Sequence, residues 1–199
     1  NPFCLAMYEE KGSAFPSKII SLVFTIFILA SNIGLHQTAA MRIVVQRVKS
    51  ASVTVEGNKI SSIGPGILAL VGLHENDTTE DLSYCCKRLL GCKLWSNDGG
   101  MWRNGVKTKG YEVLCVSQFT LYGTLSKKHQ PDYKLAMKAV PAEALYNQFL
   151  DMLKDSYEME KIKDGKFGAM MDVELVNDGP VTIVIESGPK ASVEEKESS

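Results

Sequence analysis

The chain has 199 residues, of which 45% are hydrophobic, so it can form one sizeable core or at most two small ones. Its formal net charge of −1 creates no overall field that attracts nucleic acid, so any such contact requires a local basic patch. Five cysteines form no C-x-x-C pair and three histidines are scattered. This pattern argues against a disulfide scaffold and a zinc site and favours a reducing compartment, and we expect no metal and no cofactor.

The first forty residues differ in composition from the rest of the chain. Residues 19–30 are nearly all apolar and are followed by small residues, as in the apolar region and exit site of a signal peptide. This run is short for a membrane span of about 20 residues. We expect 1–40 to be a leader or an upstream extension outside the fold. A folded domain over 41–187 and a disordered charged tail over 188–199 would follow. For 1–40, organelle targeting, a membrane segment and a non-native extension all stay open.

The first third of the domain consists of β-strand patterns. Residues 42–49 and 51–55 predict a strand that continues or carries a bulge, and glycine-containing turns separate it from shorter runs at 59–63 and 67–72. We expect these strands to form a β-meander. Arg47 lies among apolar neighbours in the first strand. It is either an exposed edge residue or a buried donor to carbonyl groups, because its guanidinium presents a rigid set of donors.

A helix is predicted to start at Asp77-Thr-Thr-Glu80, where the residues favour a helix N-terminus. Apolar and cysteine side chains then recur at helical spacing up to Gly91, and the adjacent cysteines are interpreted as core residues. These inward residues are Leu82, Cys85, Cys86, Leu89 and Leu90. A short strand is predicted at 93–95. A loop follows that carries Trp102, Arg103 and the basic run 107–109, which is either an exposed loop or a contact for phosphate or a base.

The second half of the domain alternates strands with one more helix. A buried strand at 111–116 continues into Ser117-Gln118-Phe119-Thr120, and a second basic loop follows at 127–132. An amphipathic helix is predicted to start at Pro141 with Leu145, Phe149, Met152 and Leu153 facing inward. A glycine-containing loop at 164–169 leads to apolar runs at 171–176 and 181–186. This order predicts an α+β fold with two amphipathic helices.

The last two apolar runs are separated by residues 177–182, Asn-Asp-Gly-Pro-Val-Thr. Each of these residue types favours a bent backbone for its own reason. A turn containing Gly179-Pro180 presents main-chain carbonyls and almost no side chain, and a Gly-Pro bond is one that can be cis. A plain connector between two strands is the alternative interpretation.

Conventional catalytic motifs are missing from the sequence: there is no G-x-S-x-G, no H-E-x-x-H and no P-loop. Two features are left. Ser117, Gln118 and Thr120 end a buried strand, where their side chains can line a pocket, and residues 177–182 offer carbonyls. Serine and threonine at strand ends commonly only cap turns, so neither feature identifies a function alone.

Four segments, taken in order, resemble the D-aminoacyl-tRNA deacylase family over 41–187. They begin at Met41 (Met-Arg-Ile-Val-Val-Gln-Arg-Val), Ser117 (Ser-Gln-Phe-Thr-Leu), Asp164 (Asp-Gly-Lys-Phe-Gly-Ala-Met) and Asn177 (Asn-Asp-Gly-Pro-Val-Thr). The resemblance implies a homodimeric hydrolase with a mainly antiparallel, barrel-like sheet. Such an enzyme cleaves the ester between a D-amino acid, or glycine, and the terminal adenosine of tRNA. The loop 125–133 is one residue longer than the family's usual pattern, which concerns tRNA contacts and not the catalytic motifs.

The resemblance also implies roles for individual residues. The carbonyls of Gly179 and Pro180, with a cis bond between them, would enter the other subunit's active site and exclude L side chains, and Arg47 would hold their loop. Ser117, Gln118 and Thr120 would line the catalytic pocket. Thr120 matches a position once favoured as the nucleophile, whereas the tRNA's own 2′-hydroxyl can instead assist attack by water. The adenosine pocket would contain Phe119, Phe167 and Met171.

Physical chemistry supports these implied roles. A methylene's worth of contact discriminates by only about 1–3 kcal/mol, so a filter of rigid carbonyls separates the two hands better than a flexible side chain. No histidine or carboxylate lies near Thr120 in sequence, which argues against a classically activated nucleophile. It favours backbone N–H groups that stabilise the developing oxyanion, a contribution of about 2.7–4 kcal/mol per donor in other hydrolases.

Two other interpretations are considered. One is a dimeric nucleic-acid-binding module with the same fold and no essential hydrolysis, although the net charge does not support strong DNA binding. The other is an α+β scaffold without this function, which the ordered match disfavours. An aminoacyl-tRNA substrate implies the cytoplasm or an organelle with translation, and no membrane partner is expected for the folded domain.

Overall fold

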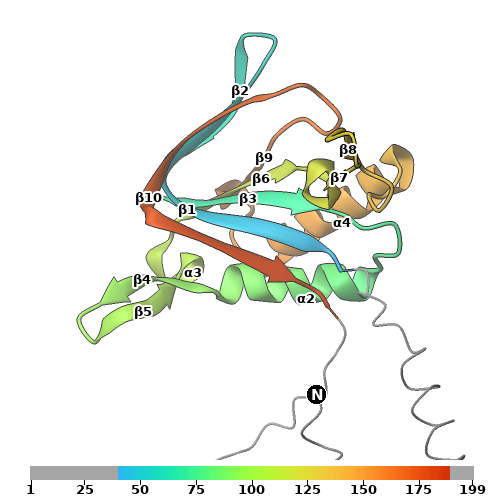
Figure 1. Cartoon of the computed structure of the whole chain (residues 1–199). Helices are drawn as coiled ribbons and strands as arrows, with labels where there is room; N and C mark the ends of the chain where they lie inside the picture. The colour runs from blue at the N-terminus through green and yellow to red at the C-terminus, as the bar shows by residue number, and fades with distance from the viewer. Residues whose placement is uncertain (1–39, 189–199) are drawn as a thin grey trace, which may run out of the picture. The chain divides into compact units, whose positions relative to one another are not determined.

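The structure is a computed structural model that describes residues 40–188. The expected leader, up to residue 39, and the expected tail from residue 189 lie outside the described residues, so the domain boundaries stay predictions. With the labels of Figure 1, the elements are β1 (Arg42–Val55), β2 (Asn58–Ile63), β3 (Gly66–Gly72), α2 (Thr79–Gly91), β4 (Lys93–Asn97), β5 (Gly100–Gly105), α3 (Val106–Lys109), β6 (Glu112–Ser117), η2 (Phe119–Tyr122), β7 (Thr124–Leu125), β8 (Pro131–Asp132), α4 (Ala139–Ser156), η3 (Met159–Lys161), β9 (Ile162–Asp164) and β10 (Asp172–Glu186).

Strand β1 organises the main sheet. The sheet has six strands in the order β10-β1-β3-β6-β9, with β2 paired to the second half of β1. The pairings of β1 with β2, β3 and β10 are antiparallel, and those of β3 with β6 and β6 with β9 are parallel. The strands curve around one another into a nearly closed, barrel-like sheet (Figure 1). The predicted α+β class with a mainly antiparallel, barrel-like sheet is confirmed. The expected meander is wrong, because β3 pairs with β1 and not with β2.

Strand β6 is buried on both faces, and its side chains alternate between two clusters. Val113 and Cys115 belong to the core that contains the helices, whereas Leu114 and Val116 belong to a second core between β1, β2 and β3. Because successive side chains of a strand point to opposite faces, a strand covered on both sides is apolar throughout. This burial explains why the sequence signal at β6 is a continuous apolar run.

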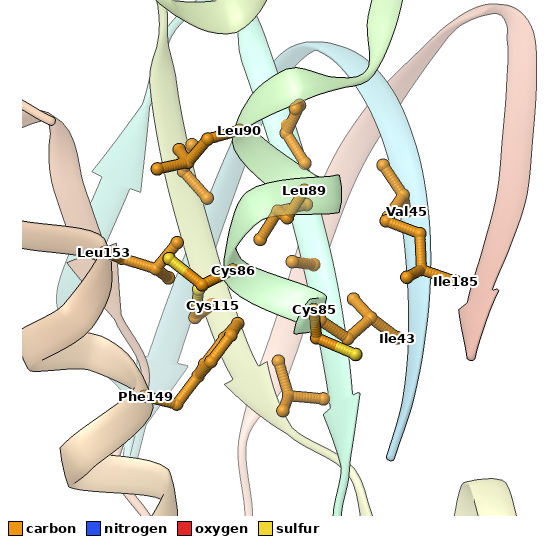
Figure 2. Packing of buried hydrophobic residues seen from close by; sticks show 14 of the residues in the cluster. Ile43, Val45, Cys85, Cys86, Leu89, Leu90, Cys115, Phe149, Leu153 and Ile185 are labelled. Atoms are coloured by element: carbon orange, nitrogen blue, oxygen red, sulfur yellow. The ribbon is translucent and has the colours of Figure 1, made fainter. Parts of the chain in front are cut away.

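Helix α2 packs between helix α4 and the strands β1 and β10. Figure 2 shows Cys86 beside Leu153 of α4, and Cys85 on the side of Ile43 of β1. The predicted inward face of α2 is confirmed, since Leu82, Cys85, Cys86, Leu89 and Leu90 are all buried. Burial raises the pKa of the Cys85 thiol to about 12 and also raises that of Cys86, so both thiols stay protonated core residues. Their interpretation as core residues is therefore confirmed.

Helix α4 extends from Ala139 to Ser156 and is the second predicted amphipathic helix. Phe149 and Leu153 are fully buried as expected, but Leu145 and Met152 are only partly buried. Tyr146 takes the more central position, with 2% of its surface exposed. No helix in the described part of the chain has the length and hydropathy needed to span a membrane.

Two local expectations are wrong. The segment after β4, expected to be a loop, forms strand β5, which pairs antiparallel with β4, followed by the short helix α3. The side chains of β5 are mostly exposed and do not alternate between apolar and polar, which explains why the strand was missed. Residues 127–132 were all expected to form a loop. The loop is shorter than that, because Pro131–Asp132 form strand β8, which pairs with Thr124–Leu125 of β7.

Residues 177–182 do not connect two neighbouring strands. They lie inside one long strand, β10, and both flanks of this segment pair with β1. Gln46 pairs with Thr182 and Val48 pairs with Asn177, so the four residues between them bulge out opposite Arg47. Figure 1 shows the sharp bend of β10 at this point. The interpretation as a plain connector in a hairpin is therefore wrong. The Gly179-Pro180 bond is cis, as expected.

Candidate active site

The polar cluster predicted as catalytic lies where β6 ends. Ser117 is the last residue of β6, and the chain then turns through Gln118 into the 3-10 helix η2. The Gln118 backbone N–H donates to the Val71 carbonyl at 2.7 Å, which ties this turn to the neighbouring strand β3. The Gln118 side-chain amide donates to the Thr120 hydroxyl. The geometry therefore brings Gln118 and Thr120 into direct contact at the start of η2.

Glycine at position 72 allows η2 to approach the end of β3. A Cβ at Gly72 would lie 3.0 Å from a ring carbon of Tyr122 and 3.2 Å from the Gln118 carbonyl oxygen. Both distances are tighter than most contacts of a real Cβ, so a larger residue would push η2 away from the sheet. Gly72 thus helps to set the position of the polar cluster.

A pocket of about 650 Å³ opens beside this cluster. Its walls are the ends of β3 and β6, the first turns of α4 and the loop between β9 and β10. The lining residues used below are Ser117, Gln118, Phe119, Thr120, Tyr146, Phe167 and Met171. All six residues predicted for the catalytic and adenosine pockets therefore meet in one cavity, although they come from segments far apart in the sequence.

Aromatic side chains frame the pocket on two sides. Phe119 is 57% exposed and its ring lies edge-on to Tyr133, with the ring centres 5.0 Å apart. The Tyr146 and Phe167 rings are 5.6 Å apart. Tyr133 follows β8, so the longer loop noted in the sequence packs against the rim of the pocket. Of these rings, the exposed Phe119 and the partly exposed Phe167 are suitable surfaces for stacking a base.

The polar groups that line the pocket are neutral. They are the hydroxyls of Ser117 and Thr120, the amide of Gln118 and the phenol of Tyr146, and the lining residues in the described part of the chain include no histidine, lysine or carboxylate. Burial raises the pKa of Tyr146 well above its ordinary value, so the phenol stays protonated. Its hydroxyl has no hydrogen-bond partner among the described residues. Sequence analysis missed Tyr146 because its pattern is that of an ordinary helical core residue.

Arg47 and the Gly179-Pro180 segment form a second region. Arg47 donates through Nη1 to the Leu94 carbonyl, and its Nε lies 3.0 Å from Asp178 Oδ2. This second contact is an ion pair and not an aligned hydrogen bond, because Nε has no hydrogen-bond partner. Of the two interpretations of Arg47, the donor to a carbonyl agrees with the structure, but the side chain is partly buried and not fully buried. Asp178 was not predicted as a functional residue, because its position opposite Arg47 depends on the pairing of β1 with β10.

Gly179 has little room for a side chain. Its φ of 119° lies in a region that L residues rarely adopt, and a Cβ there would be 2.8 Å from a methyl carbon of Val181. The same Cβ would be 3.2 Å from an Arg47 guanidinium nitrogen. The side chain of Arg47 therefore packs directly against the backbone of the bulge. Gly179 and Pro180 are exposed to solvent.

The two regions are separate within one chain. Neither Arg47, Gly179 nor Pro180 is among the residues that line the pocket. Among the described residues, no group of three or more histidine, cysteine, aspartate or glutamate side chains is arranged to hold a metal ion.

Comparison with known proteins finds a matching family, a similar relative and two similar solved structures. Residues 44–186 match the family described as D-Tyr-tRNA(Tyr) deacylase. The chain is 53% identical over 147 residues to a D-aminoacyl-tRNA deacylase of Drosophila melanogaster, a match that covers 74% of this chain and 92% of that protein.

Two solved structures are similar to this one. The first, named "c-Myc DNA Unwinding Element Binding Protein", has a TM-score of 0.69 and 48% identity, and the match covers 72% of this chain and 97% of that chain. The second, named "Structural Analysis of a probable eukaryotic D-amino acid tRNA deacylase", has a TM-score of 0.64 at 14% identity, and the match covers 74% and 99%. At that identity the second likeness supports the fold alone.

Proposed function

The chain belongs to the D-Tyr-tRNA(Tyr) deacylase family and acts as a D-aminoacyl-tRNA deacylase, and from this premise we propose how it binds, selects and cleaves its substrate. The pocket beside η2 receives the 3′-terminal adenosine and its amino acid. The observation that carries this proposal is the meeting of Ser117, Gln118, Thr120, Phe167 and Met171 in one cavity. The products are free amino acid and tRNA.

The binding of adenosine is assigned to the apolar and aromatic side of the pocket. Phe119, Phe167 and Met171 supply flat or polarisable apolar surface, which suits the face of a base. Phe119 stands at the exposed edge of the pocket, where a base can reach it. The polar side, with Ser117, Gln118 and Thr120, then faces the ester.

The chemistry relies on positioning and hydrogen bonds. Hydroxyl and amide groups bind water and carbonyl oxygen, but they do not accept a proton at neutral pH. The 2′-hydroxyl of the terminal adenosine therefore assists a water molecule that attacks the ester, while N–H donors at the start of η2 stabilise the oxyanion. This assignment is supported by the neutral lining of the pocket. A tRNA that ends in 2′-deoxyadenosine tests it, since hydrolysis at an undiminished rate contradicts the role of the 2′-hydroxyl.

Selection of the D configuration is assigned to main-chain carbonyls of Gly179 and Pro180 from a second copy of the chain. Within one chain this segment does not line the pocket, and it is exposed at the surface. Arg47 contacts both Asp178 and the backbone at Gly179, which supports a role in holding the segment in one conformation. Carbonyls fixed in this way exclude an L side chain and admit a D side chain or glycine, so glycyl-tRNA is also a substrate.

The homodimer that this selection requires is supported by the edge of the sheet. Strand β10 is the terminal strand of the sheet order, and it exposes apolar side chains on both sides of the bulge. These are Leu175, Val176, Ile183 and Val184, which are between 36% and 57% exposed. An exposed apolar edge strand can pair with another chain through its free N–H and C=O groups. In the proposed dimer, a second copy related by two-fold symmetry covers these apolar side chains.

The decisive experiment measures hydrolysis of one tRNA charged with a D-amino acid, an L-amino acid or glycine by the full-length chain. We expect fast hydrolysis of the D-aminoacyl and glycyl esters and at least about 100-fold slower hydrolysis of the L ester, since each factor of ten corresponds to 1.36 kcal/mol. Equal rates for D and L esters contradict the carbonyl filter. Arg47→Ala is expected to raise L hydrolysis or lower activity while the dimer stays folded, and unchanged selectivity removes Arg47 from the mechanism.

A second candidate function is DNA binding, which the name of one similar solved structure gives for that protein. The basic residues Arg103, Lys107 and Lys109 near the β4-β5 hairpin supply positive charge for such a contact. Binding that depends on phosphate contacts weakens steeply with salt. Salt-dependent binding of duplex DNA together with slow hydrolysis of every aminoacyl-tRNA favours this function over the first.

The proposed substrate also bears on location. An enzyme that acts on aminoacyl-tRNA works in proofreading of translation, in the cytoplasm or in an organelle that translates its own proteins. Residues 1–40 are proposed to be a leader or an extension outside the domain 41–187. A fluorescent fusion of the full-length chain, compared with a fusion that lacks residues 1–40, tests whether this segment directs the protein to an organelle.

A further inference from the structure

Arg47 is held by the β4-β5 hairpin as well as by the bulge of β10. On one side it donates to the Leu94 carbonyl of β4. On another side its guanidinium carbon lies 5.9 Å from the centre of the Trp102 ring, on β5. A guanidinium over an aromatic face is attracted by the ring's electron density, and tryptophan gives the strongest attraction. Figure 1 shows the hairpin extending from the side of the sheet where β10 bends.

The backbone conformation at position 102 disfavours a tryptophan. Its φ of 59° is left-handed, a conformation that glycine and asparagine adopt easily and bulky residues avoid. Burial gives no reason for a tryptophan either, because Trp102 is 47% exposed. A bulky residue kept in an unfavourable conformation at the surface points to a function for its side chain. The ring's contact with Arg47 provides that function.

The ion pair with Asp178 is insufficient to fix Arg47 alone. The two side chains are 17% and 31% exposed, and partly exposed ion pairs hold their partners weakly because water screens the charges. The Leu94 carbonyl fixes one end of the guanidinium. The Trp102 ring adds a third contact to the guanidinium, beside the carbonyl and the carboxylate.

We infer that Trp102 is a positioning residue for D/L selection: its ring fixes the Arg47 guanidinium, which in turn holds the Asp178-Gly179-Pro180 bulge. This inference rests on the proposed function of that bulge. It gives the β4-β5 hairpin a role in substrate selection, although the hairpin is exposed and does not line the pocket. It also predicts that the hairpin and the bulge respond together when either is changed.

The test compares Trp102→Gly with Trp102→Phe, each alone and combined with Arg47→Ala. Glycine suits the left-handed backbone, so Trp102→Gly is expected to melt at the same temperature as the parent protein or higher. We expect this variant to raise the ratio of L to D hydrolysis about tenfold. Trp102→Phe keeps an aromatic face and is expected to keep most of the selectivity. The matched control is Met101→Ala, which removes the neighbouring side chain, 68% exposed, and leaves the guanidinium-ring contact in place.

Two further readouts separate positioning from a merely structural role. In the Arg47→Ala background, Trp102→Gly is expected to add no further loss of selectivity, because residues that act through one another are not additive. Amide exchange in residues 177–182 is expected to be at least threefold faster in Trp102→Gly and close to the parent rate in Trp102→Phe. Additive effects, or an unchanged exchange rate, overturn the inference. Exchange does not depend on catalysis, so it tests the contact even if the parent protein fails to distinguish D from L esters, a result that overturns the proposed function.

Discussion

The pocket and the β10 bulge are built in opposite ways. The pocket lies within one chain, has apolar walls, and takes its polar groups from a turn whose backbone is tied to the sheet through the Gln118 N–H and the Val71 carbonyl. The bulge lies at the edge of the sheet, exposes its main chain, and depends on one guanidinium. One chain therefore supplies the lining of the pocket, whereas the bulge, under the proposed function, acts in the pocket of a second copy.

This difference predicts how each region responds to change. A site that depends on burial tolerates the loss of one neutral polar group, because water or a neighbouring group can replace it. A segment that depends on a few close contacts with the backbone does not tolerate added volume. The largest effects of small substitutions are therefore expected at the bulge.

Gly179→Ala is expected to have the largest effect. The added Cβ meets Val181 at 2.8 Å and requires a strained φ of 119°, so the main chain must move. A displacement of about 1 Å in a positioning group can lower a rate roughly 100-fold. We expect a loss of this size in hydrolysis of D-aminoacyl-tRNA, measured as initial release of free amino acid. Gly91→Ala is the control, because a Cβ there has no neighbour within 4 Å. Full activity of Gly179→Ala together with unchanged rejection of the L ester would show that the bulge is not part of the site.

Thr120→Val is expected to have a much smaller effect. Valine keeps the shape of threonine, and the Gln118 amide that donates to Thr120 is exposed and can bond to water instead. We expect at least about a tenth of the parent activity in single-turnover hydrolysis. Loss of a true nucleophile lowers kcat by roughly 10⁴-fold or more. A loss of that size in Thr120→Val would restore threonine as the nucleophile and end the contrast between the two regions.

Asp77→Asn tests the support behind the pocket through pH. Asp77 accepts a hydrogen bond from the His74 N–H at 2.6 Å, and His74 packs edge-on against Tyr122 of η2. Burial raises the pKa of Asp77 from 3.8 to about 7. The folded protein thus keeps the proton up to about pH 7, whereas the unfolded chain releases it near pH 4. The stability that this proton contributes is complete below pH 4 and is lost as the pH rises to 7.

We expect the parent protein to be more stable at pH 5 than at pH 8, and Asp77→Asn to reduce that difference. Urea titrations at both pH values measure the free energy of unfolding. Thermal melting is a second measurement, in which a change of about 1 kcal/mol moves the melting temperature by roughly 2–4 °C in a chain of this size. Asp98→Asn on the exposed β4-β5 turn serves as the control. An equal pH dependence in the parent and Asp77→Asn would assign the effect to other groups.

Tyr146→Phe is expected to have the smallest effect. The hydroxyl has no partner among the described residues, so its removal costs no hydrogen bond and relieves an uncompensated loss of hydration. We expect the free energy of unfolding to stay within about 0.5 kcal/mol of the parent value or to rise. Tyr146→Ala, which removes the whole ring, is expected to lose about 3–5 kcal/mol. A marked loss of activity in Tyr146→Phe would show that the hydroxyl contacts the substrate.

Much of the fold could be predicted from local patterns. The apolar run of β6 and the helical spacing in α2 follow directly from which faces are buried, so their positions were found within about one residue. Strand β5 was missed because its exposed side chains carry no alternation, and its formation depends on pairing with β4. The burial of Tyr146 in place of Leu145 was also missed, because a shift of one residue around a helix depends on the partner that it packs against.

The sequence by itself determined which residues can form the site. The order of Ser117-Gln-Phe-Thr and Asn177-Asp-Gly-Pro along a strand-rich chain was sufficient, because residue chemistry and the resemblance depend on identity and order. Only the tertiary structure decided that residues 177–182 are a bulge within β10, that Arg47 contacts Asp178, and that Trp102 joins them. These are contacts between segments separated by about fifty residues or more. Their geometry depends on the pairing of β1 with β10 and on the position of the β4-β5 hairpin, which no local pattern specifies.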